Sequence, residues 1–474
     1  MAQAHLYDQV SEPSTPRSVA DLFAERERSR YLTHSRYLNE QMVRVLKAIG
    51  YDVGFCRGDA QYLYDRDGVR YLDLLSGYGA FAIGRNHPAL REMLKSVLDG
   101  EFPNLVQMDV STLAGILAER LLARAPYLDK VFFANSGSEA VEAAIKFARA
   151  ATGRPGIVYC EHAFHGLTYG ALSLNGDDIF RDGFEPFLPG CQCIPFNDLS
   201  ALEKALHSRA AAAFIVEPIQ GKGVNLPDAG YLQSAAELCR RYGTLFVVDE
   251  VQTGLGRTGR FLAIEHWNVE PDMVLLAKAL SGGHVPVGAV LARRQVFEKV
   301  FNRMDRAVVH GSTFGSNDLA MAAGIATLDV IASERLIENA ARMGERLTRA
   351  LDAMIPRYEF LHAVRGKGLM IGIEFGPPKS LRLKSSWHAL EASRTGLFCQ
   401  LITIPLFKEH KILTQVASHT SHTVKLLPPL VISNSDCDWT LNALDSVIAA
   451  SERVPGAVWS LGKTLIANAV RAGA

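Results

Sequence analysis

The middle of the chain alternates short apolar runs with longer segments of helical pattern. The apolar runs are "KVFFANSG", "GIVYCEHAFHG", "AAFIVEPIQG", "LFVVDEVQTG" and "MVLLAKALSGG", each with polar residues at its carboxyl end. Runs of about five apolar, often β-branched residues are typical of buried strands. Helical patterns such as "SEAVEAAIKFARAATG" and "GYLQSAAELCRRYG" lie between them. The alternation predicts an α/β fold with a mainly parallel sheet covered by helices on both faces.

The two ends of the chain have a different pattern. Residues 1–75 combine helical pieces with a predicted hairpin, "AQYLYDRDGVRYLDL", whose Asp-Gly pair forms the turn. Further on, "SERLIENAARMGERLTRALDAMI" predicts a long helix, and "LMIGIEF" and "VKLLPPLVI" predict strands. Residues 377–425 are less regular and give only weak strand patterns. We therefore predict a large domain over 76–335 and a small α+β domain built from 1–75 and 336–474, with a helical tail at the end.

Composition and charge favour small-molecule chemistry. Of 474 residues, 48% are hydrophobic, and 50 lysines and arginines balance 50 aspartates and glutamates. A balanced chain has no net field to attract nucleic acid. The start of the sequence lacks the apolar segment of a signal peptide, and no run of 18 apolar residues occurs. The seven cysteines, an odd number, predict reduced thiols rather than a disulfide framework. These features predict a cytoplasmic protein.

Two short groups of possible metal ligands do not make a metal site. Cys191 and Cys193 form a lone C-x-C without a second pair at zinc spacing. His419 and His422 lie three positions apart in "SHTSHT", with no carboxylate or third histidine beside them. We predict no metal and a solvated loop around the histidines.

Charged side chains follow three of the predicted strands. Glu217, Asp249 and Lys278 stand at or just after the carboxyl ends of these apolar runs. In open α/β sheets, ligands bind outside this edge. A buried ammonium group is costly unless it is paired or chemically used. Lys278 could therefore serve chemistry, or it could end its strand and extend its side chain to water.

Three further features lie near the same predicted edge. Gly137 and Ser138 begin a helix whose free amides could cradle a phosphate, although Ser-x-x-Glu is also an ordinary capping box. Phe164 precedes a turn, where its ring could stack on a flat cofactor or pack in the core. Asp249, with Gln252 three residues on, needs a cationic partner, and a protonated ring nitrogen would serve.

One cofactor uses all of these features together. Pyridoxal 5'-phosphate needs a lysine for its Schiff base and an acid beneath its pyridine nitrogen. It also needs a phosphate cradle and an aromatic face. Each feature alone has another interpretation, but the chain presents them jointly and in the expected order.

Several long motifs carry a resemblance to a known family. They include "SGYGAFAIGRNHP", "NSGSEAVEAAIKFAR", "FHGLTYGALS", "FIVEPIQGKGV", "LFVVDEVQTGLGRTGRFLAIEH", "PDMVLLAKALSGGHVPVGAV" and "HGSTFGSNDLA". From about residue 30 to about residue 450 the chain resembles the class III, or ω-type, aminotransferases of PLP fold type I. Relatives of this kind handle ornithine, acetylornithine, putrescine and related amines. The resemblance implies a mainly parallel sheet of the seven-stranded type and a PLP-dependent aminotransferase.

The resemblance implies roles for residues around the cofactor ring. Lys278 would form the Schiff base and, once displaced, move the proton between substrate and cofactor as general acid and base. Asp249 would pair with the pyridinium nitrogen. Gln252 would contact the O3′ region of the ring, and Phe164 would stack on the ring.

The resemblance also implies roles around the phosphate and the substrate. Gly137 and Ser138 would hold the phosphate, and Thr313 would reach the phosphate of the neighbouring subunit, which implies a homodimer with a shared active site. Tyr78 matches an aromatic position at the substrate mouth. Glu217 matches an acid close to the cofactor.

Departures from the family pattern bear on the substrate. Amino-acid-handling members usually carry an arginine where this chain has Leu167, and many have an arginine where it has Lys425. Lysine cannot bind a carboxylate bidentately as arginine does. Where relatives read Gly-Glu-Gly after "EPIQ", this chain has Lys222, which lies either near the entrance or in solvent. We expect transfer between an amine, ω-amino compound or aldehyde without an α-carboxylate and a 2-oxo acid bound through Lys425.

Other interpretations stay open at this point. The tail "SERVPGAVWSLGKTLIANAVRAGA" has apolar residues at roughly helical spacing, so it packs on the protein's own surface or makes a peripheral membrane contact. With "LFKEHKILTQV" it resembles a branch associated with hopanoid biosynthesis, which implies a lipid aldehyde as substrate. A PLP decarboxylase or aminomutase would share the lysine and the aspartate.

Overall fold

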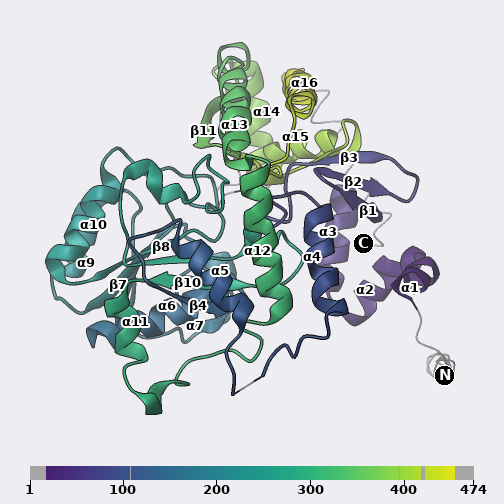
Figure 1. The fold of residues 1–474 in the computed structure, drawn as a ribbon. Helices are drawn as coiled ribbons and strands as arrows, with labels where there is room; N and C mark the ends of the chain where they lie inside the picture. Colours follow the sequence, from purple (N-terminus) through teal and green to yellow (C-terminus); the bar gives the residue numbers. More distant parts are fainter. Residues whose placement is uncertain (1–17, 107, 394–395, 418–421, 454–474) are drawn as a thin grey trace, which may run out of the picture.

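A computed structural model describes residues 18–453, except 107, 394–395 and 418–421. Its centre is a sheet of seven strands (Figure 1). In spatial order the strands are β4 (Lys130–Ala134), β10 (Gly288–Ala292), β9 (Met273–Leu276), β8 (Leu245–Asp249), β7 (Ala211–Val216), β5 (Gly156–Cys160) and β6 (Cys191–Ile194). Strand β10 runs antiparallel to both of its neighbours, and the pairs among β9, β8, β7, β5 and β6 are parallel. The predicted mainly parallel sheet is confirmed.

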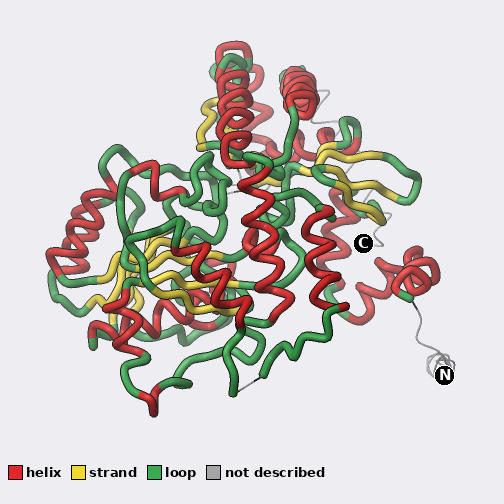
Figure 2. Tube along the Cα trace, viewed as in Figure 1, coloured by secondary structure: helices red, strands yellow, loops and turns green. Residues whose placement is uncertain are grey.

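Both faces of this sheet are buried, because successive side chains of each strand point to opposite faces. On β8, Val247 packs in one apolar cluster with α6 (Gly137–Thr152), while Phe246 and Val248 belong to another with α10 (Tyr231–Tyr242). Helices therefore cover the sheet on both sides (Figure 2). Two-sided burial explains why the strands read as continuous apolar runs.

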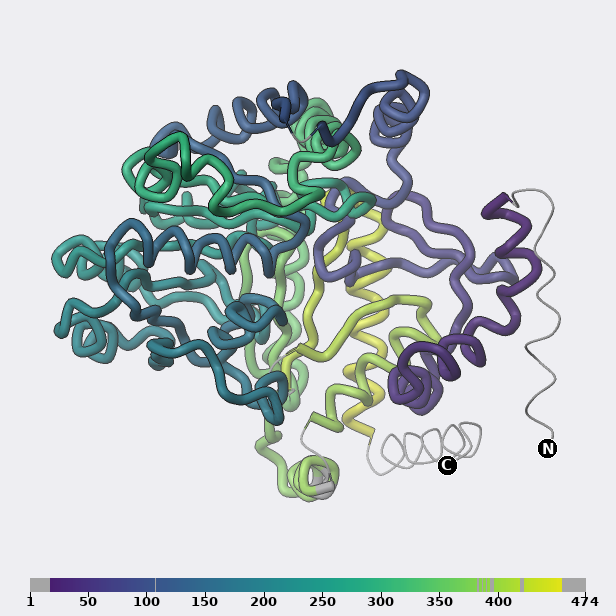
Figure 3. The backbone as a smooth tube through the Cα atoms, turned by 90° about the horizontal axis from the view of Figure 1, so that it is seen from below, coloured from purple at the N-terminus to yellow at the C-terminus, as the bar shows by residue number. Residues whose placement is uncertain are grey.

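Two smaller sheets flank the seven-stranded one. The first has the order β1 (Phe55–Asp59), β2 (Tyr62–Asp65), β3 (Arg70–Asp73) and β13 (Ile412–Leu413). The second has the order β11 (Leu361–Lys367), β12 (Met370–Phe375), β15 (Thr423–Leu426) and β14 (Gln415–Val416). Because β13 pairs in parallel with β3, N-terminal and C-terminal segments lie side by side (Figure 3).

The long helix α12 (Asp318–Ser333) lies between the large sheet and the N-terminal elements, packed on α4 (Pro88–Asp99) and α5 (Thr112–Leu122) (Figure 1). Helix α13 (Leu336–Asp352) follows, as its pattern predicted. The other helices are α1 (Val19–Arg26), α2 (Arg30–Tyr37), α3 (Glu40–Ile49), α7 (Tyr169–Leu172), α8 (Asp178–Arg181), α9 (Leu199–Leu206), α11 (Arg294–Val300), α14 (Leu381–Ser393), α15 (Leu397–Lys408) and α16 (Asn434–Ser451). None of the helices in the described part is long and apolar enough to cross a membrane.

The segment 377–425 differs from its prediction, because it forms the helices α14 and α15 rather than only weak strands. Helix α15 is buried on most of its circumference, so its sequence shows no amphipathic period. His422 is half-buried, and its Nε2 atom lies 2.7 Å from Oε2 of Glu391. His422 is therefore partly exposed and lies beside a carboxylate that its local sequence did not predict. His419 and the C-terminal tail lie outside the described residues.

Candidate active site

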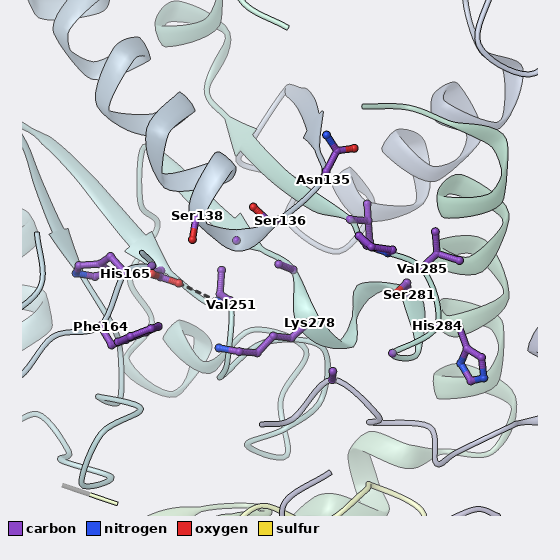
Figure 4. A pocket seen from close by; sticks show the side chains of 18 residues that line it. Asn135, Ser136, Ser138, Phe164, His165, Val251, Lys278, Ser281, His284 and Val285 are labelled. Carbon is purple, nitrogen blue, oxygen red and sulfur yellow. Dashed lines mark hydrogen bonds and ion pairs between the residues drawn. The ribbon is translucent and has the colours of Figure 1, made fainter. Parts of the chain in front are cut away.

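A cavity of about 420 Å³ opens at the carboxyl ends of the strands β4, β5, β8 and β9 (Figure 4). Five of the residues predicted from sequence line it together, namely Gly137, Ser138, Phe164, Asp249 and Lys278. They come from four separate β-α connections. The fold thus brings them to one place, as the strand-end pattern predicted.

Lys278 begins a short 3₁₀ turn, Lys278–Ser281, just after β9. Its side chain extends inside the cavity toward Phe164 and Val251 (Figure 4). Burial lowers the pKa of Lys278, and the charges of Asp249 and Glu217 only partly oppose this effect. More of its amine is therefore unprotonated than in an exposed lysine. The side chain thus lies in the cavity, where the residue keeps intermediate exposure to solvent.

The carboxylate of Asp249 is held on both oxygens. Oδ1 accepts a hydrogen bond from the backbone N–H of Val251 (3.0 Å), and Oδ2 lies 2.8 Å from Nδ1 of His165. Burial alone would lower the pKa of His165, but the hydrogen bond and the charge of Asp249 raise it overall. His165 stands in the "FHG" motif, but no pattern around it predicted a role for its side chain. The structure places it as the residue that orients the acid.

The amino terminus of α6 forms a cradle of backbone amides. Ser136 caps the helix by accepting the N–H of Glu139 (3.1 Å), and Ser136, Gly137 and Ser138, at the helix start, line the cavity. The Oγ atom of Ser138 accepts the N–H of Leu167 (3.3 Å). A Cβ atom on Gly166 would lie 2.2 Å from this Oγ atom, so only glycine fits here. The helix dipole and the free amides suit an anion such as a phosphate.

Glu217, at the end of β7, joins two turns beside the cavity. Its carboxylate accepts the backbone N–H of Phe164 at Oε2 (3.1 Å) and that of Gly221 at Oε1 (2.9 Å). Burial raises the pKa of Glu217, and the charge of His165 opposes this. The acid therefore fixes the turn that carries Phe164.

Gln252, Lys425 and Tyr78 form a second network. Nζ of Lys425 donates to the carbonyl of Gly221 (2.8 Å) and to Oε1 of Gln252 (3.0 Å). Nε2 of Gln252 donates to the carbonyl of Tyr78 (3.2 Å). The side chain of Tyr78 is 56% exposed. These three residues lie close together. None of them is among the described residues that line the cavity with Lys278.

Lys425 is only 3% exposed, and its ammonium group meets two neutral oxygens rather than a carboxylate. Burial, together with the nearby charge of Lys278, lowers the pKa of Lys425 to about 7. Its charge is therefore sensitive to pH near neutrality.

Lys222 does not lie free in solvent. Its Nζ atom lies 2.6 Å from Oδ2 of Asp177 and 3.9 Å from the centre of the Phe180 ring. The side chains of Lys222 and Asp177 are 22% and 14% exposed. No motif links these residues, because Asp177 is 45 positions away in the sequence.

Thr313 lies apart from Lys278. It lines a second cavity of about 820 Å³ between α4, α5 and the segment before α12. Within one chain, the described structure does not bring Thr313 to the first cavity.

Comparison with known protein families identifies the family of this chain. Residues 50–448 match the family model described as Aminotransferase class-III. The chain belongs to the class III aminotransferases. Its activity is pyridoxal 5'-phosphate-dependent transfer of an amino group, as the motifs implied.

Individual class III aminotransferases are similar to this chain over most of its length. The aminotransferase PigE of Serratia sp. is 36% identical over 93% of this chain, and the chain spans 56% of the length of PigE. Ornithine aminotransferase of Bacillus cereus is 37% identical, with 83% of this chain and 93% of the relative covered. Acetylornithine aminotransferase of Archaeoglobus fulgidus is 39% identical, covering 81% and 92%. All three are aminotransferases, so the decarboxylase and aminomutase alternatives are not favoured, and none of the three is named for a lipid aldehyde.

Solved class III structures agree with the fold. An ornithine aminotransferase from Toxoplasma gondii aligns with a TM-score of 0.80 and 29% identity, covering 92% of this chain and 99% of the other. An amine transaminase from an uncultivated Pseudomonas species aligns with a TM-score of 0.73 and 28% identity, covering 84% and 95%. PLP fold type I is confirmed.

The residues present fit pyridoxal 5'-phosphate. The amide cradle, with Gly166 where a Cβ atom would collide, suits its phosphate. An acid held by His165 suits its ring nitrogen, and a buried amine of lowered pKa suits its carbonyl carbon.

Proposed function

We propose that this class III aminotransferase moves an amino group between an amine, ω-amino compound or aldehyde and a 2-oxo acid, with Lys278 as the attachment and proton-transfer residue. The observation that carries the proposal is the convergence of Lys278 and a carboxylate, Asp249, on one cavity beside an amide cradle. Tyr78, Glu217 and Gln252 complete the proposed surroundings.

When bound, pyridoxal 5'-phosphate supplies a carbonyl carbon that condenses with amines and a protonated ring that draws electrons from the bond to be broken. The roles of the chain's own residues follow from their contacts. Asp249 keeps a proton on the ring nitrogen, and His165 keeps Asp249 in place. The lowered pKa of Lys278 lets its amine accept a proton from the substrate carbon and return it at a neighbouring atom. Phe164, which lines the cavity, would cover the ring and help to exclude water.

The cations around the cavity support a substrate without an α-carboxylate. Arg257 is buried and donates to the carbonyls of Leu369 (3.2 Å) and Pro428, and Lys222 is paired with Asp177. No arginine stands among the described residues that line the cavity. Leu167, where amino-acid-handling relatives usually carry arginine, is 56% exposed. A guanidinium fork that would grip an amino-acid carboxylate is therefore missing from this part of the described site.

Lys425 differs from these cations, because it hydrogen-bonds only to neutral oxygens. No carboxylate directly pairs with its positive charge. In its protonated form it can attract the carboxylate of a 2-oxo acid, as a point charge rather than a fork. We propose that Lys425 serves the acceptor half of the reaction.

We also propose a homodimer in the cytoplasm, in which Thr313 of one subunit serves the phosphate site of the other. Thr313 is exposed in the single chain, as a residue that meets a second subunit would be. The seven cysteines are all free, which suits a reducing compartment.

A screen of amino donors and acceptors tests the substrate proposal. Simple terminal amines and aldehydes should show saturable turnover with a 2-oxo acid such as pyruvate or 2-oxoglutarate. Turnover of ornithine or acetylornithine alone, with none of the simple amines or aldehydes, would contradict it.

A further inference from the structure

The segment after the "FHG" turn is tied back to that turn by side chains that the reaction itself does not use. Asn175 is fully buried and joins this segment to the turn, because its Oδ1 atom accepts the N–H of His165 (3.0 Å) and its Nδ2 atom donates to the carbonyl of Gly166 (2.9 Å). Asp177 and Phe180 follow at once, at the start of and within the short helix α8. The segment is thus fixed at the turn that carries Phe164.

Phe180 touches Phe164 directly. Their ring centres are 5.3 Å apart and their planes meet at 72°. Aromatic pairs prefer this arrangement, in which the positive edge of one ring meets the negative face of the other. Phe164 lines the cavity, so the position of Phe180 limits the rotation of a ring that faces the cofactor.

Lys222 also contacts the Phe180 ring. Its Nζ atom lies 3.9 Å from the ring centre and 2.6 Å from Oδ2 of Asp177. The cation attracts the ring face, and the carboxylate prevents the cation from turning away. Lys222 itself is absent from the described residues lining the cavity, so its link to the site runs through Phe180.

The backbone beside Lys222 is also connected to Phe164. The N–H of the preceding Gly221 donates to Glu217 (2.9 Å), whose other oxygen accepts the N–H of Phe164 (3.1 Å). The turn at Gly221 and Lys222 is therefore linked to Phe164 by two routes, one through the carboxylate of Glu217 and one through the Phe180 ring.

We propose that Lys222 is a positioning residue, which, clamped by Asp177, fixes Phe180 against Phe164 and thereby sets the orientation of the ring that stacks on the cofactor. The proposal rests on the proposed function, in which Phe164 covers pyridoxal 5'-phosphate. It assigns to Lys222 a role in cofactor geometry rather than in binding a substrate carboxylate.

Equilibrium titration of the cofactor-free chain with pyridoxal 5'-phosphate, together with visible circular dichroism of the bound cofactor, tests this assignment. Lys222→Met keeps the aliphatic stem and removes the charge, so it should weaken cofactor binding about three- to tenfold and change the dichroic band. Phe180→Leu should act similarly, and Asp177→Asn more weakly. Lys222→Arg should restore both readouts, because a guanidinium also binds a ring face and a carboxylate.

Lys95→Met is the matched control, because Lys95 pairs with Glu92 (3.0 Å) on the distant helix α4. It should leave both readouts unchanged. Thermal unfolding of each cofactor-free variant separates loss of fold from loss of cofactor geometry.

A double-mutant cycle with Phe164→Leu separates the positioning role of Lys222 from the proposed stacking role of Phe164. If Lys222 acts through Phe164, Lys222→Met should add nothing to Phe164→Leu. Additive effects, or wild-type titration and dichroism in Lys222→Met, would overturn the positioning role. A raised KM for the 2-oxo acid with unchanged cofactor readouts would also overturn it, in favour of direct substrate contact. If Phe164→Leu itself leaves cofactor binding unchanged, the proposed place of the cofactor fails as well.

Discussion

Nδ1 of His165 lies 2.8 Å from Oδ2 of Asp249, inside a pocket that excludes water from both groups. The pair joins the ends of β5 and β8, which are separated in the sheet by β7. Because His165 holds one oxygen and the N–H of Val251 holds the other, the carboxylate cannot rotate freely. The acid is thus presented to the cavity in a fixed direction.

Replacing Asp249 by asparagine removes the charge and keeps the shape. We expect kcat to fall about a hundredfold or more, because the ring nitrogen loses the anion that keeps it protonated. Stopped-flow measurement of the first half-reaction would show it. Wild-type rates in Asp249→Asn would show that the charge of Asp249 has no role in the reaction.

Lys278→Ala should abolish turnover while leaving the protein folded, since the side chain faces a cavity rather than the core. Borohydride reduction of the loaded wild-type enzyme, followed by peptide mass mapping, should find the cofactor on Lys278. Attachment at Lys425 or Lys222 instead would contradict the assignment.

Gly166→Ala and Gly153→Ala form a matched pair of substitutions at positive φ. Gly153, at the end of α6, has φ +68° and open space around it, so alanine should cost about 1 kcal/mol of stability and leave cofactor affinity unchanged. At Gly166 the new Cβ atom would collide with Ser138 in the cradle. We expect cofactor affinity to fall about tenfold there, measured by titration. Equal affinities in the two variants would refute a phosphate cradle at Ser138.

The KM for the 2-oxo acid should rise with pH. The pKa of Lys425 is lowered to about 7, so the side chain is charged below this pH and loses its charge as the pH increases through it. A carboxylate should then bind more weakly in mildly alkaline solution. Lys425→Met should give a high KM at every pH, and Lys425→Arg should flatten the rise, because arginine stays charged. The KM of an uncharged aldehyde acceptor is the internal control, because it should not follow the charge of Lys425. If the pH profile of the KM for the 2-oxo acid is the same in Lys425→Met as in the wild type, Lys425 does not bind this substrate.

A shared active site predicts complementation between two damaged subunits. Lys278→Ala and Thr313→Ala chains, unfolded and refolded together, should recover about a quarter of the wild-type sites, since random pairing makes half of the dimers mixed and each has one intact site. Each variant alone should stay below this activity. No recovery in a mixture shown to contain mixed dimers would mean that Thr313 serves its own subunit or neither.

The sequence predicted the strand-end residues well, because a parallel sheet forces the carboxyl ends of its strands to one edge. Lys278, Asp249, Phe164, Gly137 and Ser138 therefore meet at one cavity. The fold class and the long helix α13 followed from the same patterns. The division at residues 75 and 335 and the roles of individual site residues stay predictions.

Other contacts could not be predicted from the sequence. The pairing of Lys222 with Asp177 joins segments 45 positions apart, so no local pattern marks it. The bonds of Lys425 to Gly221 and Gln252 could not be predicted either, because they depend on how strand β15 meets two turns that are distant in the sequence. Helix α15 was missed because burial on most of its circumference removes the polar face that reveals a helix.

The pairing of β3 with β13 has a consequence for folding of the protein during its synthesis on the ribosome. Leu72 pairs with Ile412, and nearby the Oγ atom of Ser76 donates to the carbonyl of Leu427, 351 positions later. At about 5–20 residues per second, translation delivers the second partner roughly 20–70 s after the first. Until then the edge of β3 has no native neighbour and is open to pairing with other nascent chains. Slow or stalled translation of the last quarter of the message should therefore favour aggregation over maturation.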